Sequence, residues 1–201
     1  MKALIIVDIQ NDFMPGGALA VPEGDQIISI INNIIPKFDA VVATQDWHPK
    51  DHKSFASQHQ GKAIFDNINL EGLSQTLWPD HCIQNTTGAA FHPELKQDGI
   101  HAIFRKGMIS NLDSYSGFYD NAHRNTTGLH GYLKDREVTE VYVCGLSKDY
   151  CVYFTALDSI ANGYKTYIIS DAAMPISWND WELKKEHYKS IGGLMIQSSE
   201  L

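Results

Sequence analysis

The sequence of 201 residues lacks long hydrophobic runs, has only three cysteines and carries no excess of positive charge. Its longest apolar runs, near residues 4–7, 27–35 and 141–146, are far shorter than the ~20 residues that a membrane helix needs. Three cysteines cannot all pair, which argues against a disulfide scaffold and favours a reducing cytoplasm. Because phosphate binding needs clustered basic residues, 16 Lys and Arg against 24 Asp and Glu argue against a nucleic-acid partner.

The composition is that of an ordinary globular protein, with 43% hydrophobic residues, 20% charged residues and a formal net charge of −8. The first apolar stretch is too short for a signal peptide and is expected to be a strand. We expect strands at residues 4–7, 40–44, 101–105, 140–145, 166–170 and 194–197, and helices at 26–35, 128–136, 150–161 and 180–191. This alternation predicts a parallel sheet with helices on both faces, and residues 1–201 are expected to form one domain.

A long irregular region, residues 45–99, interrupts this alternation and is rich in His, Asp, Asn, Gly and Pro. Loops of this length in compact domains usually carry function. In parallel sheets, ligands bind beyond the carboxyl ends of the strands. The chemically useful residues at the expected strand ends are Asp8, Asp46, His48, Lys106 and Cys151.

Cys151 lies where an expected strand turns into a helix. A thiol in the first helical turn is close to the positive end of the helix dipole, which favours the thiolate. Neighbouring backbone N–H groups at such a turn can stabilise an oxyanion. A buried structural cysteine is the alternative, and we prefer it for Cys144, within a strand, and for Cys82.

Asp8 and Lys106 each have an ordinary interpretation beside a functional one. An Asp after a strand often forms a turn or caps a helix, but it can also be a partly buried base. Most lysines are solvated surface residues, but a lysine at the carboxyl end of a strand can stabilise a thiolate or an oxyanion.

The histidines include candidate metal ligands. Asp46 and His48 are two residues apart, so in an extended segment their side chains point the same way. His52 and His81 follow, and one Asp with two or three His suits zinc, iron or manganese. With nine histidines in the chain, such spacing also arises by chance.

Taken together, these segments resemble the nicotinamidases, which include bacterial pyrazinamidases, of the isochorismatase-like cysteine hydrolases. The matching segments are VDIQNDF (7–13), PGGAL (15–19), TQDWHP (44–49), WPDHC (78–82), FHP (91–93), KG (106–107), YSGF (115–118) and DYCV (149–152). They occur in family order and cover most of the chain. The resemblance implies an isochorismatase-like hydrolase fold, a single-domain three-layer α/β/α sandwich with a mainly parallel sheet.

The resemblance also implies roles for individual residues. The catalytic residues would be Asp8, Lys106 and Cys151. The ligands of one divalent metal ion per chain, zinc first and iron or manganese as alternatives, would be Asp46, His48 and His81, while His52 matches a histidine that ligates directly in some members only. The substrate-binding residues would be Phe13, Trp78 and Tyr115 around the ring, with Leu146 and Ser147 in an oxyanion region that contains a cis peptide bond.

The implied reaction is hydrolysis of nicotinamide to nicotinate and ammonia through a thioester on Cys151, with pyrazinamide as a further substrate. The metal would bind the ring nitrogen, and the product would enter NAD salvage. One alternative is a cysteine amidase of the same family that acts on a carbamoyl or ureido substrate without a metal. Another is a non-catalytic pyridine-binding protein. The sequence leaves the oligomeric state open, a homo-oligomer included.

Three segments depart from the family pattern. Ser147-Lys148 replaces the common Ala-Thr, and we expect the Lys148 side chain to point to solvent. Asn85 replaces a usual Gly, and Asn tolerates a positive φ. The tail with Trp178 and Trp181 is unusual and is expected to lie outside the site.

Overall fold

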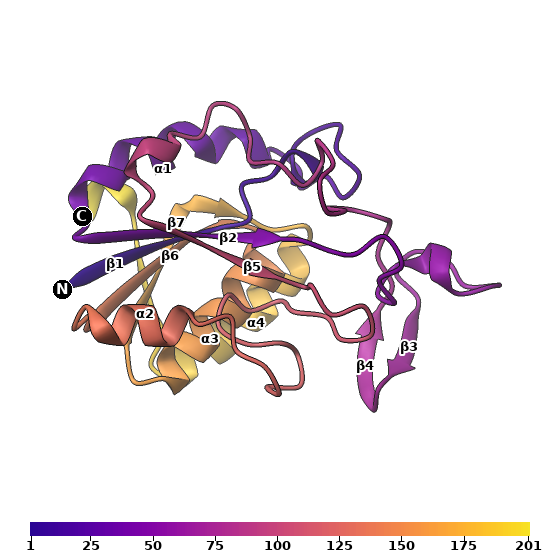
Figure 1. Cartoon of the computed structure of the whole chain (residues 1–201). Coiled ribbons are helices and arrows are strands. Elements are labelled where there is room, and N and C mark those ends of the chain that lie inside the picture. Colours follow the sequence, from indigo (N-terminus) through magenta and orange to yellow (C-terminus); the bar gives the residue numbers. More distant parts are fainter.

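The computed structural model describes residues 1–201 and contains a six-stranded, fully parallel sheet in the order β5-β2-β1-β6-β7-β8 (Figure 1). The strands are β1 (Lys2–Val7), β2 (Ala40–Asp46), β5 (Ala102–Lys106), β6 (Glu140–Leu146), β7 (Lys165–Met174) and β8 (Leu194–Ile196). The helices are α1 (Ile27–Ile34), α2 (Leu129–Asp135), α3 (Tyr153–Ala161) and α4 (Trp178–Ser190). Every expected strand and helix is present, and the predicted α/β fold class is confirmed.

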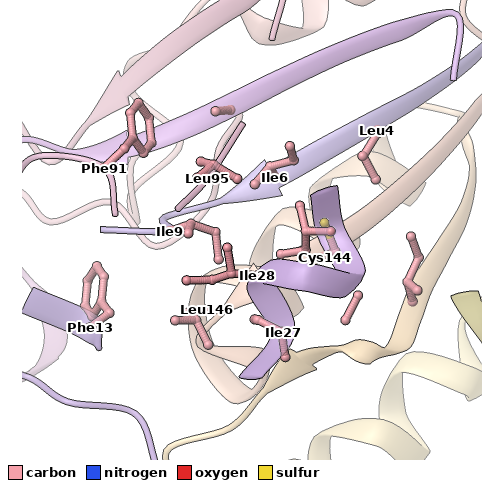
Figure 2. Close-up of a cluster of buried hydrophobic side chains, with 14 of the residues drawn as sticks. Leu4, Ile6, Ile9, Phe13, Ile27, Ile28, Phe91, Leu95, Cys144 and Leu146 are labelled. Carbon is pink, nitrogen blue, oxygen red and sulfur yellow. The ribbon is translucent and has the colours of Figure 1, made fainter. Parts of the chain in front are cut away.

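Two apolar cores lie on the two faces of the sheet, because the central strands are buried on both sides. In β1, Leu4 and Ile6 pack on the α1 side, and Ile5 and Val7 pack on the side of α2, α3 and α4 (Figures 1 and 2). A strand covered on both faces is apolar throughout, as the uninterrupted run in β1 predicts. The three layers therefore follow from the sequence pattern.

The long region 45–99 contains a feature that the sequence analysis did not predict. Strands β3 (Asn67–Leu70) and β4 (Leu73–Thr76) form an antiparallel hairpin. Its two turn residues, Glu71 and Gly72, both have positive φ (52° and 88°). This turn geometry usually takes Asn-Gly or Asp-Gly, and the two strands, which are only partly buried, have little apolar alternation, so the usual hairpin signals are weak.

The predicted helix at residues 150–161 does not begin as an α-helix. A π-helical turn, Lys148–Val152, precedes α3 and contains Cys151. None of the helices is long and apolar enough to span a bilayer.

Candidate active site

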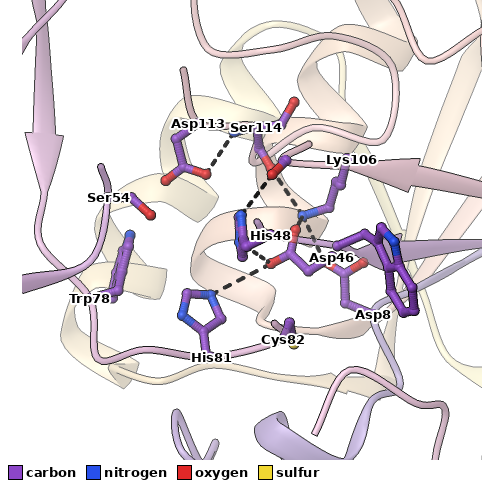
Figure 3. Close-up of polar contacts among 12 residues, drawn as sticks. Asp8, Asp46, His48, Ser54, Trp78, His81, Cys82, Lys106, Asp113 and Ser114 are labelled. Carbon is purple, nitrogen blue, oxygen red and sulfur yellow. Dashed lines mark hydrogen bonds and ion pairs between the residues drawn. The ribbon is translucent and has the colours of Figure 1, made fainter. Parts of the chain in front are cut away.

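The carboxyl ends of four adjacent strands meet at one edge of the sheet, and the polar residues expected there lie together (Figure 3). Asp8 follows β1 with a positive φ of 49°, and it is fully buried. Asp46 and Lys106 are the last residues of β2 and β5 and are paired in the sheet register. Cys151 follows β6 in the π-helical turn. Sheet topology thus gathers residues that are up to 143 positions apart, from 8 to 151.

The ammonium of Lys106 lies at the centre of this cluster. Its Nζ is 2.9 Å from Asp8 Oδ2 and 2.5 Å from Asp46 Oδ1. It also donates to Cys151 Sγ at 3.4 Å and to the Ser114 carbonyl at 3.0 Å. Burial opposes the charged form, but the carboxylates of Asp46 and Asp8 outweigh it and raise the pKa of Lys106 well above its usual value. Lys106 is therefore a permanent buried cation and not the solvated lysine of the ordinary interpretation.

Asp8 and Cys151 are both buried beside this cation, and burial dominates their acidity. Burial raises the pKa of Asp8, while Lys106 and a 2.6 Å hydrogen bond from Thr44 Oγ1 partly offset that effect. Burial also raises the pKa of the Cys151 thiol well above its usual value, against the opposing charge of Lys106. The thiol is thus protonated near neutral pH, and its position at a helix start does not by itself produce a thiolate. A neighbouring base has to remove the proton.

A second cluster adjoins the first through Asp46. Asp46 Oδ2 lies 3.5 Å from His48 Nε2 and 3.7 Å from His81 Nε2 (Figure 3). The ligand atoms of these three buried residues lie within 4.8 Å of one another. One carboxylate and two imidazoles fit a borderline divalent cation such as zinc. The opposite nitrogens of both rings are held by backbone carbonyls, the arrangement that orients metal-binding histidines in proteins.

Gly107 explains how the ring of His48 reaches its position. Its carbonyl lies 2.9 Å from His48 Nδ1, and a Cβ at residue 107 would lie 2.4 Å from His48 Cε1. The positive φ of 67° at Gly107 is a second reason for glycine there. The Lys106-Gly107 pair therefore provides a buried ammonium and the space for a histidine ring.

A small pocket joins the two clusters. Cys151 and Ser147 line it, and so do the side chains of Asp46, His48 and His81. The predicted ring-binding aromatics Phe13, Trp78 and Tyr115 all line the same pocket. The predicted Leu146 does not, since its side chain is buried in the core on the α1 side (Figure 2). The cis peptide bond implied for Leu146–Ser147 is present.

Four further lining residues were not predicted: Leu19, Asp113, Tyr150 and Ile176. Tyr150 directly precedes Cys151, and Asp113 lies two residues before Tyr115, so proximity to motif residues was the available signal. Ile176 had no such signal. Its backbone N–H donates to the Asp149 carboxylate at 3.0 Å. This hydrogen bond joins the π-helical turn that contains Cys151 to a loop 27 residues further along the chain.

The prediction that Lys148 points to solvent is wrong. Only 3% of Lys148 is exposed, and its Nζ donates to the Ser170 carbonyl at 2.8 Å. The same ammonium lies 5.0 Å from the ring centre of Trp181 and 5.7 Å from that of Trp178. Two of the segments that depart from the family pattern, Lys148 and the tail with Trp178 and Trp181, are thus in contact with each other. Lys148 itself begins the π-helical turn that contains Cys151. The third, Asn85, adopts φ 64°, as expected for an Asn in place of a Gly.

We expect Lys148→Met to stabilise the protein at pH 7 by ~1–3 kcal/mol, because apolar residues often replace buried charges favourably. Burial, reinforced by Lys185, lowers the pKa of Lys148 from 10.5 to about 8. The folded state therefore binds this proton less tightly than the unfolded state, at a cost of about 3 kcal/mol. That cost is fully present below pH 8 and disappears as the pH rises toward 10.5.

Urea unfolding of parent and variant between pH 7 and 10 measures this difference. The advantage of the variant should shrink above pH 8. A variant that is less stable than the parent at pH 7 would show that the Ser170 and indole contacts outweigh the desolvation of the ammonium.

Comparison with known proteins agrees with this architecture. Residues 2–200 match the isochorismatase domain, and the chain belongs to the isochorismatase family. Within it, the nicotinamidase of Escherichia coli K12 is 49% identical over 180 residues, which cover 88% of this chain and 84% of that protein. The resemblance to nicotinamidases that the motifs predicted is confirmed.

Two solved structures are similar over almost their whole length. The Acinetobacter baumanii nicotinamidase/pyrazinamidase has a TM-score of 0.96 and 47% identity, with 99% of this chain and 97% of that chain covered. The Pyrococcus horikoshii pyrazinamidase, solved in complex with zinc, has a TM-score of 0.80 and 40% identity, with 98% of both chains covered.

Proposed function

We propose that this chain is an amidohydrolase that converts nicotinamide to nicotinate and ammonia and also accepts pyrazinamide. The observation that carries the proposal is the single pocket lined by Cys151 together with Asp46, His48 and His81. A pyridine carboxamide has an electrophilic carbonyl and a ring nitrogen, and this pocket provides a nucleophile and a metal-ligand set within one small volume. A carbamoyl or ureido substrate has no ring nitrogen that would use the second cluster.

The aromatic walls suit a flat heteroaromatic ring. Trp78 and Tyr115 lie edge to face, with ring centres 6.3 Å apart, and the Trp78 Nε1–H donates to the Tyr115 hydroxyl at 3.3 Å. Tyr115 also packs against Tyr150 at 5.5 Å. These mutual contacts hold the walls in place before a ligand enters, so that little side-chain entropy is lost on binding.

Asp8 is the proposed general base. Its raised pKa makes it a stronger base than an exposed carboxylate, and it can take the proton of the Cys151 thiol as the sulfur attacks the amide carbon. Lys106 stabilises the negative charge that moves between Asp8 and Cys151, because its ammonium contacts both. Backbone N–H groups around Ser147 and Cys151 would bind the oxyanion, a contribution of ~3 kcal/mol per donor.

Asp8 then returns the proton to the departing nitrogen, ammonia leaves, and a nicotinoyl thioester remains on Cys151. A water molecule deprotonated by Asp8 attacks the thioester carbon, and cleavage of the C–S bond releases nicotinate and restores the thiol. A divalent cation held by Asp46, His48 and His81, zinc first, would bind the ring nitrogen and orient the carboxamide. The product would enter NAD salvage in the cytoplasm.

Chelation tests the proposal. We expect ammonia release from nicotinamide to be lost from protein stripped of metal and restored by zinc, iron or manganese, since an unanchored ring loses its orientation. The measurement is coupled detection of ammonia, with bound metal quantified in each sample. Metal-loaded protein that leaves nicotinamide intact but hydrolyses a ureido compound would contradict the proposed substrate.

A further inference from the structure

Helix α4 and the residues that lead into it contact the π-helical turn that contains Cys151 at two points of one residue, Asp149. The Asp149 carboxylate accepts hydrogen bonds from the backbone N–H groups of Ile176 at 3.0 Å and Ser177 at 2.8 Å, just before the first turn of α4. About two helical turns further along, Lys184 Nζ donates to the Asp149 carbonyl at 2.6 Å. The residue two positions before the nucleophile is therefore held through both its side chain and its main chain.

The charge of Lys184 is not paired with a carboxylate. Lys185 and Lys189, on the same helix, each pair with a glutamate three residues earlier, at 2.8 and 3.1 Å, whereas Lys184 forms no salt bridge. Its side chain is half-buried, and its ammonium lies 3.9 Å from the ring centre of Tyr150, well within the range of a cation–π contact. A backbone carbonyl and an aromatic ring thus take the place of a carboxylate around this cation.

The rings next to Lys184 belong to the aromatic wall of the pocket or pack on it. Tyr150 lines the pocket, and its ring centre lies 5.0 Å from that of Trp78 and 5.5 Å from that of Tyr115, which line it too. Phe154, whose ring centre is 5.7 Å from Lys184 Nζ, stacks on Tyr115 at 5.4 Å. Lys184 itself does not line the pocket. The ammonium therefore supports the wall from outside, through Tyr150 directly and through Tyr115 indirectly.

We propose that Lys184 is a positioning residue, which fixes the ring of Tyr150 and thereby the shape of the aromatic pocket. A ring that is fixed before binding loses little freedom when a ligand enters, so the ligand binds more tightly. The backbone of the π-helical turn has other support, because the N–H groups of Tyr150 and Val152 donate to the Ser147 carbonyl. The consequence for nicotinamide rests on the proposed function, whereas the contact between Lys184 and Tyr150 does not.

The ring-flip rate of Tyr150 tests the contact without any ligand. In the full chain labelled with carbon-13 on the tyrosine rings, the Tyr150 signal is assigned by its loss in Tyr150→Phe. Lys184→Met should raise the flip rate by about 10-fold, as expected for the loss of a cation–π contact. Lys184→Arg should keep it within about threefold of the parent rate, because a guanidinium also stacks on aromatic faces. Lys189→Met is the matched control and should leave the rate unchanged, and an unchanged rate in Lys184→Met would overturn the proposal.

Lys184→Gln separates the two contacts of the ammonium. Glutamine can still donate to the Asp149 carbonyl but has no charge to place over the Tyr150 ring. We expect this variant to raise the flip rate as Lys184→Met does. A parent-like flip rate in Lys184→Gln would show that the hydrogen bond to Asp149 is sufficient, and the cation–π assignment would then be wrong.

Steady-state hydrolysis of nicotinamide measures the consequence for the pocket. Lys184→Met should raise KM by about 10-fold and change kcat by no more than about threefold, because the reacting groups keep their places. Lys184→Arg should return KM to within about threefold of the parent value. In a Tyr150→Leu background, Lys184→Met should change KM by less than about twofold, since its effect passes through the ring. Loss of kcat at unchanged KM, or an equal rise of KM in both backgrounds, would contradict a role through Tyr150.

The two measurements separate this proposal from the proposed function. If metal-loaded parent protein does not hydrolyse nicotinamide, the proposed function fails, and the flip rate still decides whether Lys184 fixes Tyr150. If the parent hydrolyses nicotinamide and neither the flip rate nor KM responds to Lys184→Met, the positioning role fails and the amidase proposal stands. A Lys184→Met variant that is less stable in thermal unfolding, with the parent's flip rate and KM, would assign Lys184 to stability alone.

Discussion

Replacing Cys151 with alanine is expected to lower the rate of nicotinamide hydrolysis by ~10⁴-fold or more, because loss of a nucleophile removes the covalent route entirely. The fold should be retained, since the side chain loses one sulfur atom and its main polar contact is Lys106 Nζ at 3.4 Å. The measurement is ammonia release at saturating substrate, together with thermal unfolding of the same samples. Acid-quenched parent enzyme should contain a nicotinoyl adduct on Cys151 by mass spectrometry, and the variant should contain none.

Cys144→Ala is the matched control. Cys144 is also buried but lies within β6, and the hydrogen-bond contact of its thiol is with the Ile5 carbonyl, at 3.8 Å. We expect the turnover of this variant to be within a few-fold of that of the parent. Its stability should fall modestly, because the substitution leaves a small cavity. Activity in Cys151→Ala within tenfold of the parent would remove Cys151 as nucleophile.

Lys106→Met is expected to destabilise the protein by ~3–5 kcal/mol at pH 7 and to abolish turnover. The variant would leave the carboxylates of Asp8 and Asp46 buried without their counter-ion, and breaking a buried ion pair from one side costs about this much. Turnover is lost because no cation then stabilises the charge that passes between Asp8 and Cys151. Urea unfolding and ammonia release measure the two effects separately.

The loss of stability in Lys106→Met should depend on pH in one direction. In the parent, burial opposes ionisation of Asp46, but Lys106 and His48 overcome it and hold the pKa of Asp46 well below 3.8. That stabilisation is present above pH 3.8 and is lost as the pH falls through the folded pKa. In the variant the carboxylates are easier to protonate, so acid relieves the uncompensated charge. The difference in stability should therefore narrow as the pH falls from 7 toward 4.

Lys134→Met is the control for the loss of a lysine. Lys134 is exposed on α2, and a substitution there is expected to change stability by no more than ~0.5 kcal/mol at any of these pH values. A Lys106→Met variant as stable as this control would show that the buried carboxylates are protonated in the parent. The proposed role of the ammonium in catalysis would then be wrong.

The sequence by itself determined the layers and the edge of the sheet at which polar residues meet. Apolar runs in β1 and β6 identify strands buried on both faces, and the alternation with helical segments makes the sheet parallel. Because parallel strands present their carboxyl ends at the same edge, Asp8, Asp46 and Lys106 could be expected to lie together. These conclusions need only local periodicity and one rule of topology.

Only the tertiary structure decided what those residues contact. Lys106 lies between two carboxylates and a thiol, and Lys148 is buried against Trp181, although both are lysines at the carboxyl end of a strand. The carbonyl or N–H that faces each histidine comes from the backbone path of a loop, which no periodicity encodes. Burial and hydrogen-bond partners depend on segments distant in the chain, and they set which imidazoles can bind a metal and which thiol has a base beside it.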